Sequence, residues 1–300
     1  MFYNKLKIIF LLFLLSSCAD DNINNSNIDE LSEDEFIFGD SNNLNIVTWN
    51  IEHFPKSDLT IQYLKQAILS MQVDILVLQE IESSIYFNQL VNELGDNWIG
   101  YRYENSDWGE LSYLINSTNI TFDDSGLYSI LNEHQYDFAY RPPYILEFEY
   151  QNQSFILINV HYKCCGGEDN ENRRLNASLY LHDYILNNFS NNNVIVMGDF
   201  NDELIDTNNV FEIFFDNFDQ YLFADYSMAE ESNPWQYWSF PTYPSHIDHV
   251  LISNELFDEY ESSTSICNTI LIDNFLFNSW TNYDQYISDH RPVGLSLNIN

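Results

Sequence analysis

The stretch VIVMGDFND, residues 194–202, indicates how this chain folds and where its chemistry lies. Val194–Met197 are four apolar residues, which predict a buried strand. The turn that follows carries Asp199, Asn201 and Asp202 close together. Because protein scaffolds commonly place binding and catalytic groups where strands end, we expect this turn to belong to a functional cleft.

Seven other runs rich in Ile, Val, Leu and aromatic residues also predict strands. They are Leu44–Ile51, Asp74–Leu78, Leu111–Ile115, Tyr144–Tyr150, Phe155–Tyr162, His249–Ser253 and Pro292–Leu297. Two segments have apolar residues at helical spacing instead. They are Ile61, Leu64, Ile68 and Met71 after a predicted cap at Ser57, and Leu175, Leu179, Leu181, Tyr184 and Ile185. Many strands with two or three helices predict sheet packed on sheet, with helices outside.

Polar side chains of ligand type occur at the ends of these strands. They are Asn50, Glu80, His161, Asp248 and the pair Asp289-His290, in addition to Asp199 and Asn201. A single polar residue at a strand end is explained by turn chemistry. So many along one chain are hard to explain in that way, and we expect them to meet in one cleft.

Six short segments together resemble, in order, the motifs of the endonuclease/exonuclease/phosphatase superfamily. They are TWNI (48–51), QEI (79–81), NVH (159–161), GDFN (198–201), IDHV (247–250) and SDHRP (288–292). The resemblance covers Leu44 to Asn300. It implies an α+β fold, a four-layer α-β-β-α sandwich of two mainly antiparallel sheets, and metal-dependent hydrolysis of phosphoesters. Nucleases, sphingomyelinases and inositol-polyphosphate phosphatases share these motifs, so the resemblance leaves the substrate open.

The metal ligands follow from the resemblance and from the chemistry of the side chains. Hard oxygen donors suit Mg²⁺, which usually takes one or two carboxylates from a protein, and Mn²⁺ is a substitute for it. We therefore expect Glu80, with Asp289 and Asn50, to hold Mg²⁺.

The resemblance also implies the catalytic roles. Asp199 is expected to orient and deprotonate the attacking water, and Asn201 to donate to the phosphoryl oxygens. His290, positioned by Asp248, and His161 on the other side are expected to stabilise the charge that develops on phosphorus. Which histidine assists the leaving group stays open.

Two residues resemble substrate-site residues of the pancreatic-type nuclease branch. Glu110 lies where that branch has an acid that pairs with the first histidine, although a solvent-facing edge glutamate explains it equally well. Arg141 resembles an arginine that touches the substrate phosphate. The remaining histidines match no catalytic motif and are interpreted as core, surface or structural residues. They are His53, His134, His182, His246 and His249.

The first residues resemble a bacterial lipoprotein signal peptide. Residues 1–7 contain two lysines, residues 8–15 are apolar, and Leu15-Ser16-Ser17-Cys18 fits a lipobox. The apolar run is shorter than the roughly 20 residues that a transmembrane helix needs. The resemblance implies a signal peptide at 1–17, acylation of Cys18, a flexible acidic tether at 18–43 and one domain at 44–300. We expect a lipoprotein of the cell envelope, anchored in the membrane by its lipid and facing the periplasm or the outside.

The net charge and the departures from the family motifs restrict the classes of function that this chain can have. The chain has 46 acidic and 10 basic residues, a net charge of −36, which argues against architectural nucleic-acid binding. The inositol-phosphate branch of the superfamily usually has Arg where this chain has His249, and further lysines near its site, so the resemblance disfavours polyphosphorylated inositol as a substrate. We expect a Mg²⁺-dependent nuclease or phosphodiesterase acting on phosphoesters such as extracellular nucleic acid, with no protein partner. The alternatives are a sphingomyelinase-like enzyme or another lipid or phosphomonoester phosphatase and, more remotely, a non-catalytic surface-binding lipoprotein.

Two adjacent cysteines, Cys164 and Cys165, follow His161 in a loop expected at the rim of the cleft. Thiols of exported proteins tend to oxidise, so we predict a bridge between these neighbours, with Cys267 free and buried. A bridge to Cys267 and a pair of reduced thiols are the alternatives.

Overall fold

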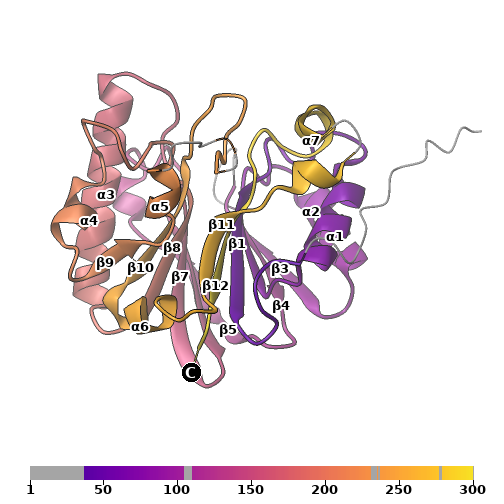
Figure 1. Ribbon diagram of the computed structural model, residues 1–300, viewed down its shortest axis with the longest axis horizontal. Helices are drawn as coiled ribbons and strands as arrows, with labels where there is room; N and C mark the ends of the chain where they lie inside the picture. The colour runs from indigo at the N-terminus through magenta and orange to yellow at the C-terminus, as the bar shows by residue number, and fades with distance from the viewer. Residues whose placement is uncertain (1–36, 105–109, 231–234, 236, 277–278, 300) are drawn as a thin grey trace, which may run out of the picture. The chain divides into compact units, whose positions relative to one another are not determined.

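A computed structural model describes residues 37–104, 110–230, 235, 237–276 and 279–299. Within these ranges the chain forms two sheets of six strands, packed face to face with helices on their outer sides (Figure 1). This is the predicted α+β sandwich. The predicted signal peptide, Cys18 and most of the predicted tether lie outside the described residues.

The first sheet has the strand order β11-β12-β1-β2-β4-β3, and the second has β5-β6-β7-β8-β10-β9. The strands of the first sheet are β1 (Leu44–Asn50), β2 (Ile75–Gln79), β3 (Trp98–Arg102), β4 (Ser112–Asn116), β11 (Ile266–Thr269) and β12 (Val293–Leu297). Those of the second are β5 (Thr121–Ser129), β6 (Tyr144–Tyr150), β7 (Gln153–His161), β8 (Asn193–Asp199), β9 (Tyr221–Phe223) and β10 (Asp248–Ser253). All eight predicted strands are present, with ends shifted by no more than two residues.

Helices cover the outer face of each sheet. The two on the first sheet are α1 (Thr60–Met71) and α2 (Ser84–Leu94), and the two on the second are α3 (Glu168–Asn188) and α4 (Glu212–Asp216) (Figure 1). Shorter turns lie in the connections: α5 (Tyr226–Ala229), α6 (Phe257–Tyr260), α7 (Trp280–Tyr286), η1 (Asn132–His134), η3 (Asn254–Leu256) and η4 (Ile272–Phe275). Among the described helices, none combines the length and apolar character needed to cross a bilayer.

Both predicted helices are confirmed as α1 and α3, but the predicted cap of the first is wrong. α1 begins after Leu59, whose side chain offers no cap. The Ser57 hydroxyl instead accepts a hydrogen bond from the Leu59 N–H at 3.1 Å, one turn before the helix. Ser57 therefore shapes the approach to α1 rather than capping it.

Strand direction brings the functional ends together. Each sheet has one parallel pair, β1 with β2 and β7 with β8, whose carboxyl ends share one edge. There Asn50 lies opposite Gln79, and His161 lies opposite Asp199. β10 runs antiparallel to β8 and starts at the same edge, with Asp248 opposite Asp199. The topology thus places the polar ends of strands from both sheets at one edge of the sandwich.

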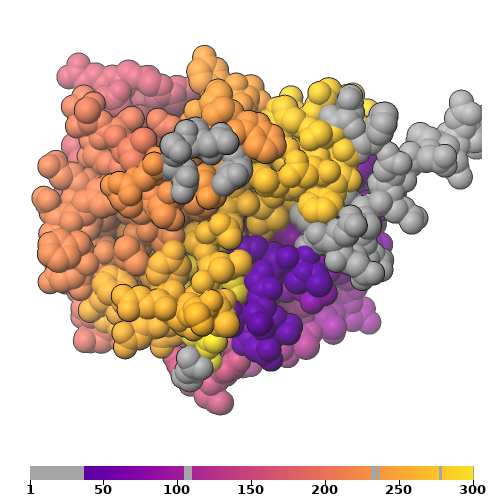
Figure 2. Space-filling view, viewed as in Figure 1, coloured from indigo at the N-terminus to yellow at the C-terminus, as the bar shows by residue number. Residues whose placement is uncertain are grey.

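The last strand of the chain lies beside the first. β12 pairs antiparallel with β1, with Leu44 opposite Leu297 and Thr48 opposite Val293. In the space-filling view, indigo residues from the start of the described chain adjoin yellow residues from its end (Figure 2). Residues just before β12 therefore reach the edge that Asn50 occupies.

A buried polar network links the two sheets beneath this edge. Gln79 Nε2 of the first sheet donates to Asn159 Oδ1 of the second at 2.9 Å, and Asn159 Nδ2 donates to Leu78 O at 2.9 Å. The Tyr113 hydroxyl donates to Tyr144 O at 2.6 Å and accepts from the Asn159 N–H at 3.0 Å. Buried polar groups that satisfy one another fix a single packing register. The network therefore sets how the strand ends of one sheet face those of the other.

Gly198 permits the close approach of β7 and β8. A Cβ atom at this position would lie 1.9 Å from Val160 O, closer than any side chain tolerates. Glycine is therefore required immediately before Asp199, because a larger residue would push the two strands apart at the edge where the polar residues meet.

Candidate active site

Side chains from both sheets converge on one oxygen of Asp199. Asn50 Nδ2 donates to Asp199 Oδ2 at 3.0 Å. His161 Nε2 lies 3.4 Å and His290 Nε2 lies 3.9 Å from the same oxygen. The structure thus brings together four residues that the sequence predicted to share a cleft.

Asp199 is poised to exchange a proton near neutral pH. Its side chain is almost fully buried, and burial raises its pKa to about 7, against the opposing influence of the positive charge of His290. The other oxygen, Oδ1, accepts the N–H of Asn201 at 2.9 Å, which fixes the orientation of the carboxyl group. A carboxyl group with a pKa near the working pH suits general base catalysis.

His290 is held as a cation by its neighbours. Its Nδ1 lies 2.8 Å from Asp248 Oδ2, so the predicted pair is formed. Burial opposes the charge, but Asp248 and Asp199 outweigh it and raise the pKa of His290 to about 10. Phe240 stacks on the ring at 4.6 Å, which also favours a cation. A charged imidazole therefore directs Nε2 toward Asp199.

His161 differs from His290 in charge. Burial, together with the positive charges of Arg141, His290 and Lys163, lowers the pKa of His161 well below its ordinary value. Its Nδ1 is buried and has no hydrogen-bond partner within the described parts of the chain. His161 is therefore a neutral imidazole at pH 7.

The predicted metal ligands offer oxygen atoms at the same place. Glu80 Oε1 accepts from Asn50 Nδ2 at 3.2 Å, and Glu80 Oε2 accepts the His53 N–H at 3.0 Å. Asn50 Oδ1 is buried without a hydrogen-bond partner in the described structure. Asp289 lies close by, with its N–H donating to Glu52 Oε2 at 3.1 Å, and burial raises its pKa to about 6. Two carboxylates and an unsatisfied amide oxygen match the donors that Mg²⁺ prefers, so these residues fit the expected ion.

The predicted pairing of Glu110 with His161 is not formed among the described residues. Glu110 is buried and its Oε1 pairs with Arg102 Nη2 at 2.8 Å, which also excludes the solvent-facing alternative. Burial raises the pKa of Glu110, and the guanidinium opposes that rise. A neutral histidine offers no charge to compensate a buried carboxylate, whereas Arg102 does.

Arg141, which is buried, and Asn201 share a contact with the Tyr162 carbonyl. Arg141 Nη2 donates to Tyr162 O at 3.0 Å, and Asn201 Nδ2 lies 3.3 Å from the same carbonyl. Burial lowers the pKa of Arg141, but the negative charges of Glu80 and Asp199 oppose that effect. Both side chains are therefore near Asp199, as predicted.

Several supporting residues were missed by sequence reasoning. The Ser288 hydroxyl donates to Asn50 O at 2.7 Å and accepts the His290 N–H at 3.0 Å, joining the two ends of the site. The Ser239 hydroxyl accepts the Asp248 N–H at 3.1 Å. Glu52, which accepts the Asp289 N–H, and Phe240, which stacks on His290, support the site in the same way. Ser288 lies within the quoted segment SDHRP. Ser239, Glu52 and Phe240 lie outside every quoted motif, and no sequence pattern marks these three residues.

The adjacent cysteines are free thiols, so the predicted bridge is absent from the structure. The Sγ atoms of Cys164 and Cys165 lie 2.9 Å apart, and Lys163 Nζ lies 3.3 Å from Cys164 Sγ. Arg174 Nη1 donates to Lys163 O and to Cys165 O, which holds this loop beside the site without a covalent link. Cys267 is also unbridged and lies against the core between the sheets.

Comparison with known proteins agrees with this geometry. The sequence model of the Endonuclease/Exonuclease/phosphatase family matches residues 47–290. The chain belongs to this family. Its members are metal-dependent phosphoesterases of the nuclease and phosphatase type, and the chain is therefore such an enzyme. No curated protein matches the chain at a significant level.

Solved structures of the family share the fold at low sequence identity. A humanized D. rerio TDP2 carrying 14 mutations has a TM-score of 0.62 at 13% identity, covering 87% of this chain and 100% of its own. The human Nocturnin catalytic domain with bound sulfate has a TM-score of 0.61 at 16% identity, covering 85% and 93%. A family member from Bacteroides thetaiotaomicron has a TM-score of 0.60 at 13% identity, covering 85% and 97%. At these identities the likeness concerns the fold alone.

Proposed function

We propose that this family member is a Mg²⁺-dependent phosphodiesterase that cleaves nucleic acid outside the cytoplasm. The observation that carries the proposal is the convergence of Asn50, His161 and His290 on one oxygen of the buried Asp199. That arrangement places a proton acceptor, a neutral histidine and a charged histidine around one point. It provides the groups that metal-assisted attack of water on phosphorus needs.

Glu80, Asp289 and Asn50 would hold the ion. Mg²⁺, or Mn²⁺ in its place, would supply positive charge that neutralises the phosphate and polarises its oxygen atoms. The chain's own contribution is to fix three oxygen donors in advance, through the Asn50 bond to Glu80 and the Glu52 bond to the backbone of Asp289. Such fixed donors lose little freedom when the ion binds.

Asp199 would accept the proton of the attacking water. With a pKa raised to about 7 by burial, the carboxylate is ionised in much of the population at neutral pH and still basic enough to take a proton. Its Oδ1 accepts the Asn201 N–H, whereas Oδ2 faces both histidines and accepts from Asn50, so Oδ2 would be the proton acceptor. The Asn201 amide would donate to a phosphoryl oxygen.

His290 would stabilise the charge that builds up on phosphorus. Its Nδ1 is engaged by Asp248, so Nε2–H is free to point into the site. Arg141 and Lys163 add positive charge nearby, as their effect on the pKa of His161 indicates. His161, being neutral, can donate a hydrogen bond from Nε2 without competing for the same electrostatic role.

Nucleic acid is the substrate that the comparisons favour. One similar solved structure is a D. rerio TDP2 complexed with a single-strand DNA product, at 12% identity and a TM-score of 0.60. The lipid alternative has less support, because the aromatic residues Phe211 and Phe214, at and in α4, are buried in the core and offer no surface to a membrane. Trp235 lies over the guanidinium of Arg291 at 4.7 Å, which gives it a structural role.

Hydrolysis of defined substrates tests the reaction. The mature protein should hydrolyse bis(p-nitrophenyl) phosphate and single-stranded DNA or RNA in Mg²⁺ and not in EDTA. Asp199→Asn should lower turnover about 100-fold or more, since a positioned base contributes about 10²–10⁴-fold. Asp183→Asn on the exposed side of α3 is the matched control and should be unaffected. Hydrolysis of sphingomyelin or phosphomonoesters in preference to nucleic acid would contradict the substrate assignment.

Membrane attachment through Cys18 is a separate part of the proposal. It is supported by the signal-like residues 1–17 and by the lipobox that ends at Cys18. In a bacterial host, the wild-type protein should fractionate with membranes, and Cys18→Ala should remain unprocessed and lack lipid. Cys267→Ala is the matched control and should behave as the wild type. Recovery of unlipidated wild-type protein in the soluble fraction would contradict this part of the proposal.

A further inference from the structure

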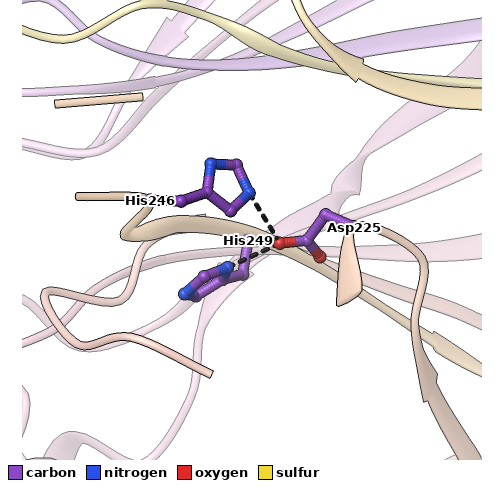
Figure 3. Close-up of side chains that lie close together, drawn as sticks. All are labelled: Asp225, His246 and His249. Carbon is purple, nitrogen blue, oxygen red and sulfur yellow. Dashed lines mark hydrogen bonds and ion pairs between the residues drawn. The ribbon is translucent and has the colours of Figure 1, made fainter. Parts of the chain in front are cut away.

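A second group of ligand-type side chains lies on the second sheet and takes no part in the mechanism above. Asp225 follows β9, His246 lies in the loop before β10, and His249 is the second residue of β10. All three are buried. Figure 3 shows both imidazole rings directing a nitrogen atom at the Asp225 carboxylate.

The three side chains meet at one carboxylate oxygen. His246 Nε2 lies 3.0 Å and His249 Nδ1 lies 2.6 Å from Asp225 Oδ2 (Figure 3). The one nitrogen that each histidine offers and the carboxylate oxygen all lie within 4.8 Å of one another. Two nitrogen donors and one oxygen donor at such separations are a set that Zn²⁺ commonly takes.

The surrounding bonds set two of the three ligands, His249 and Asp225, in the form that a metal needs. His249 Nε2 lies 2.8 Å from Asp202 O, so this nitrogen carries the proton, because a carbonyl oxygen only accepts. Asp225 Oδ1 accepts the Val250 N–H at 2.9 Å, which leaves Oδ2 for the cluster. Histidines that bind zinc usually donate their other N–H to a carbonyl or carboxylate, and such contacts fix the orientation of the ring.

Without a metal, the group is held together by protons. Burial opposes a charge on His249, but Asp225 outweighs it and raises the pKa of this histidine, so the two form a buried ion pair at 2.6 Å. His246 Nδ1 is buried and has no hydrogen-bond partner in the described part of the chain, so the contact with Asp225 is what holds this ring. A divalent ion would instead bind both rings as neutral ligands, in place of the proton shared between His249 and Asp225.

We propose that Asp225, His246 and His249 form a zinc site that is separate from the catalytic metal site. Three protein ligands leave one tetrahedral position for water. Its donors are mainly nitrogen, whereas Glu80, Asp289 and Asn50 offer only oxygen, so the two sites select different ions. The assignment does not depend on the substrate of the enzyme.

Zinc at this site would brace the catalytic turn. His249 follows Asp248, the partner of His290, and its Nε2–H donates to the carbonyl of Asp202, three residues after Asp199. Fixing His249 would therefore steady both β10 and the turn that carries the proposed base. The role is structural, since nothing places the three ligands in contact with the substrate.

Metal retention tests the proposal. The whole mature protein, without a histidine tag, is incubated with ZnCl₂ in excess Mg²⁺, passed through a desalting column and analysed for metal by mass spectrometry. We expect about one zinc per chain. At zinc one hundredfold above its dissociation constant, the midpoint of thermal unfolding should rise by about 5 °C or more.

Matched histidine variants locate the ion. His246→Gln should weaken zinc binding at least about tenfold. His182→Gln, a buried histidine packed against Phe214 and Tyr221, and His290→Gln should keep one zinc each. His246→Gln is preferred to Asp225→Asn, since it removes a single contact and leaves the Asp225–His249 pair in place.

Two results would overturn the assignment. Wild-type protein that retains no zinc would show that the cluster is a proton-held ion pair. Zinc that is lost in His290→Gln but retained in His246→Gln would place the ion at the catalytic site instead. Neither result would affect the nuclease proposal, which is tested by hydrolysis in Mg²⁺.

Discussion

Replacing Asp248 by Asn removes the negative charge beside His290 but keeps a side chain of the same size at 2.8 Å from Nδ1. In the wild type, Asp199 is ionised above about pH 7 and His290 stays charged up to about pH 10, so both are in their working forms between these values. In the variant, burial still lowers the pKa of His290, and only Asp199 and Asp289 remain to raise it. The pKa should therefore fall from about 10 toward the ordinary value of about 6.5.

The size of the effect depends on pH. A pKa of about 6.5 would leave roughly one imidazole in a hundred charged at pH 8.5, so turnover should fall there by up to about 100-fold. At pH 6.5 about half of the imidazoles are charged, and the loss should be only about twofold. The mechanism needs His290 as a cation, and the charged fraction of His290 in the variant falls as pH rises. The loss of turnover should therefore grow with pH.

The assay is the pH profile of kcat/KM for bis(p-nitrophenyl) phosphate at saturating Mg²⁺, from pH 6 to 9.5. Asp74→Asn is the control, because Asp74 is also a buried aspartate but lies at the other end of β2, where it accepts the Asn45 N–H. Its profile should match the wild type. A loss in Asp248→Asn that is equal at every pH would refute the reasoning and show that Asp248 acts through structure alone.

Three further results are expected. Glu80→Gln should raise the Mg²⁺ concentration for half-maximal activity at least about tenfold in a metal titration, while Glu82→Gln leaves it unchanged, and equal titrations would remove Glu80 from the ligands. Gly198→Ala should lower the free energy of unfolding in urea by about 3 kcal/mol, since its Cβ would lie 1.9 Å from a backbone oxygen, whereas Gly166→Ala, with nothing within 4 Å, should change it little. Raising NaCl from 10 to about 150 mM should speed DNA cleavage at low substrate, because screening weakens repulsion by the net charge of −36, and a steady decline would contradict this.

The strands that sequence predicts and those that it misses differ in their place in the sheets. The four missed strands are β3, β5, β9 and β11, and these are the edge strands of the two sheets. An edge strand has a neighbour on one side only and tolerates polar residues, as β5 does, in which none of the residues Thr121–Ser129 is buried. The eight predicted strands occupy the interior positions, where continuous apolar runs are required.

Helix α2 was missed although its signal is present. Ser83 caps it by accepting the Tyr86 N–H, and Phe87, Leu90 and Leu94 repeat at helical spacing on the buried face. A search for a cap followed by that spacing would have found it. The signal for α2 therefore lies in the local sequence and could have been recognised there.

The site was predicted residue by residue where a motif and a strand end coincide, as at Asp199 and His290. The features that were predicted wrongly or missed depend on contacts between segments that are distant in the sequence. Glu110 pairs with Arg102 because β3 and β4 are neighbours, and β3 was not predicted. The cluster of Asp225 with His246 and His249 depends on the edge strand β9 lying beside β10, so the two histidines were interpreted as structural or core residues.

The pairing of β1 with β12 has a consequence for when the enzyme becomes active. His290 lies just before β12, so the site is incomplete until β12 pairs with β1 and brings His290 to the end of the sandwich where Asn50 lies. The proposed base Asp199 comes 91 residues before His290, so segments far apart in the chain must fold together before the site is complete. Activity therefore reports on the folding of the whole sandwich, and a change that frees β12 from β1 should abolish it even with Asp199 in place.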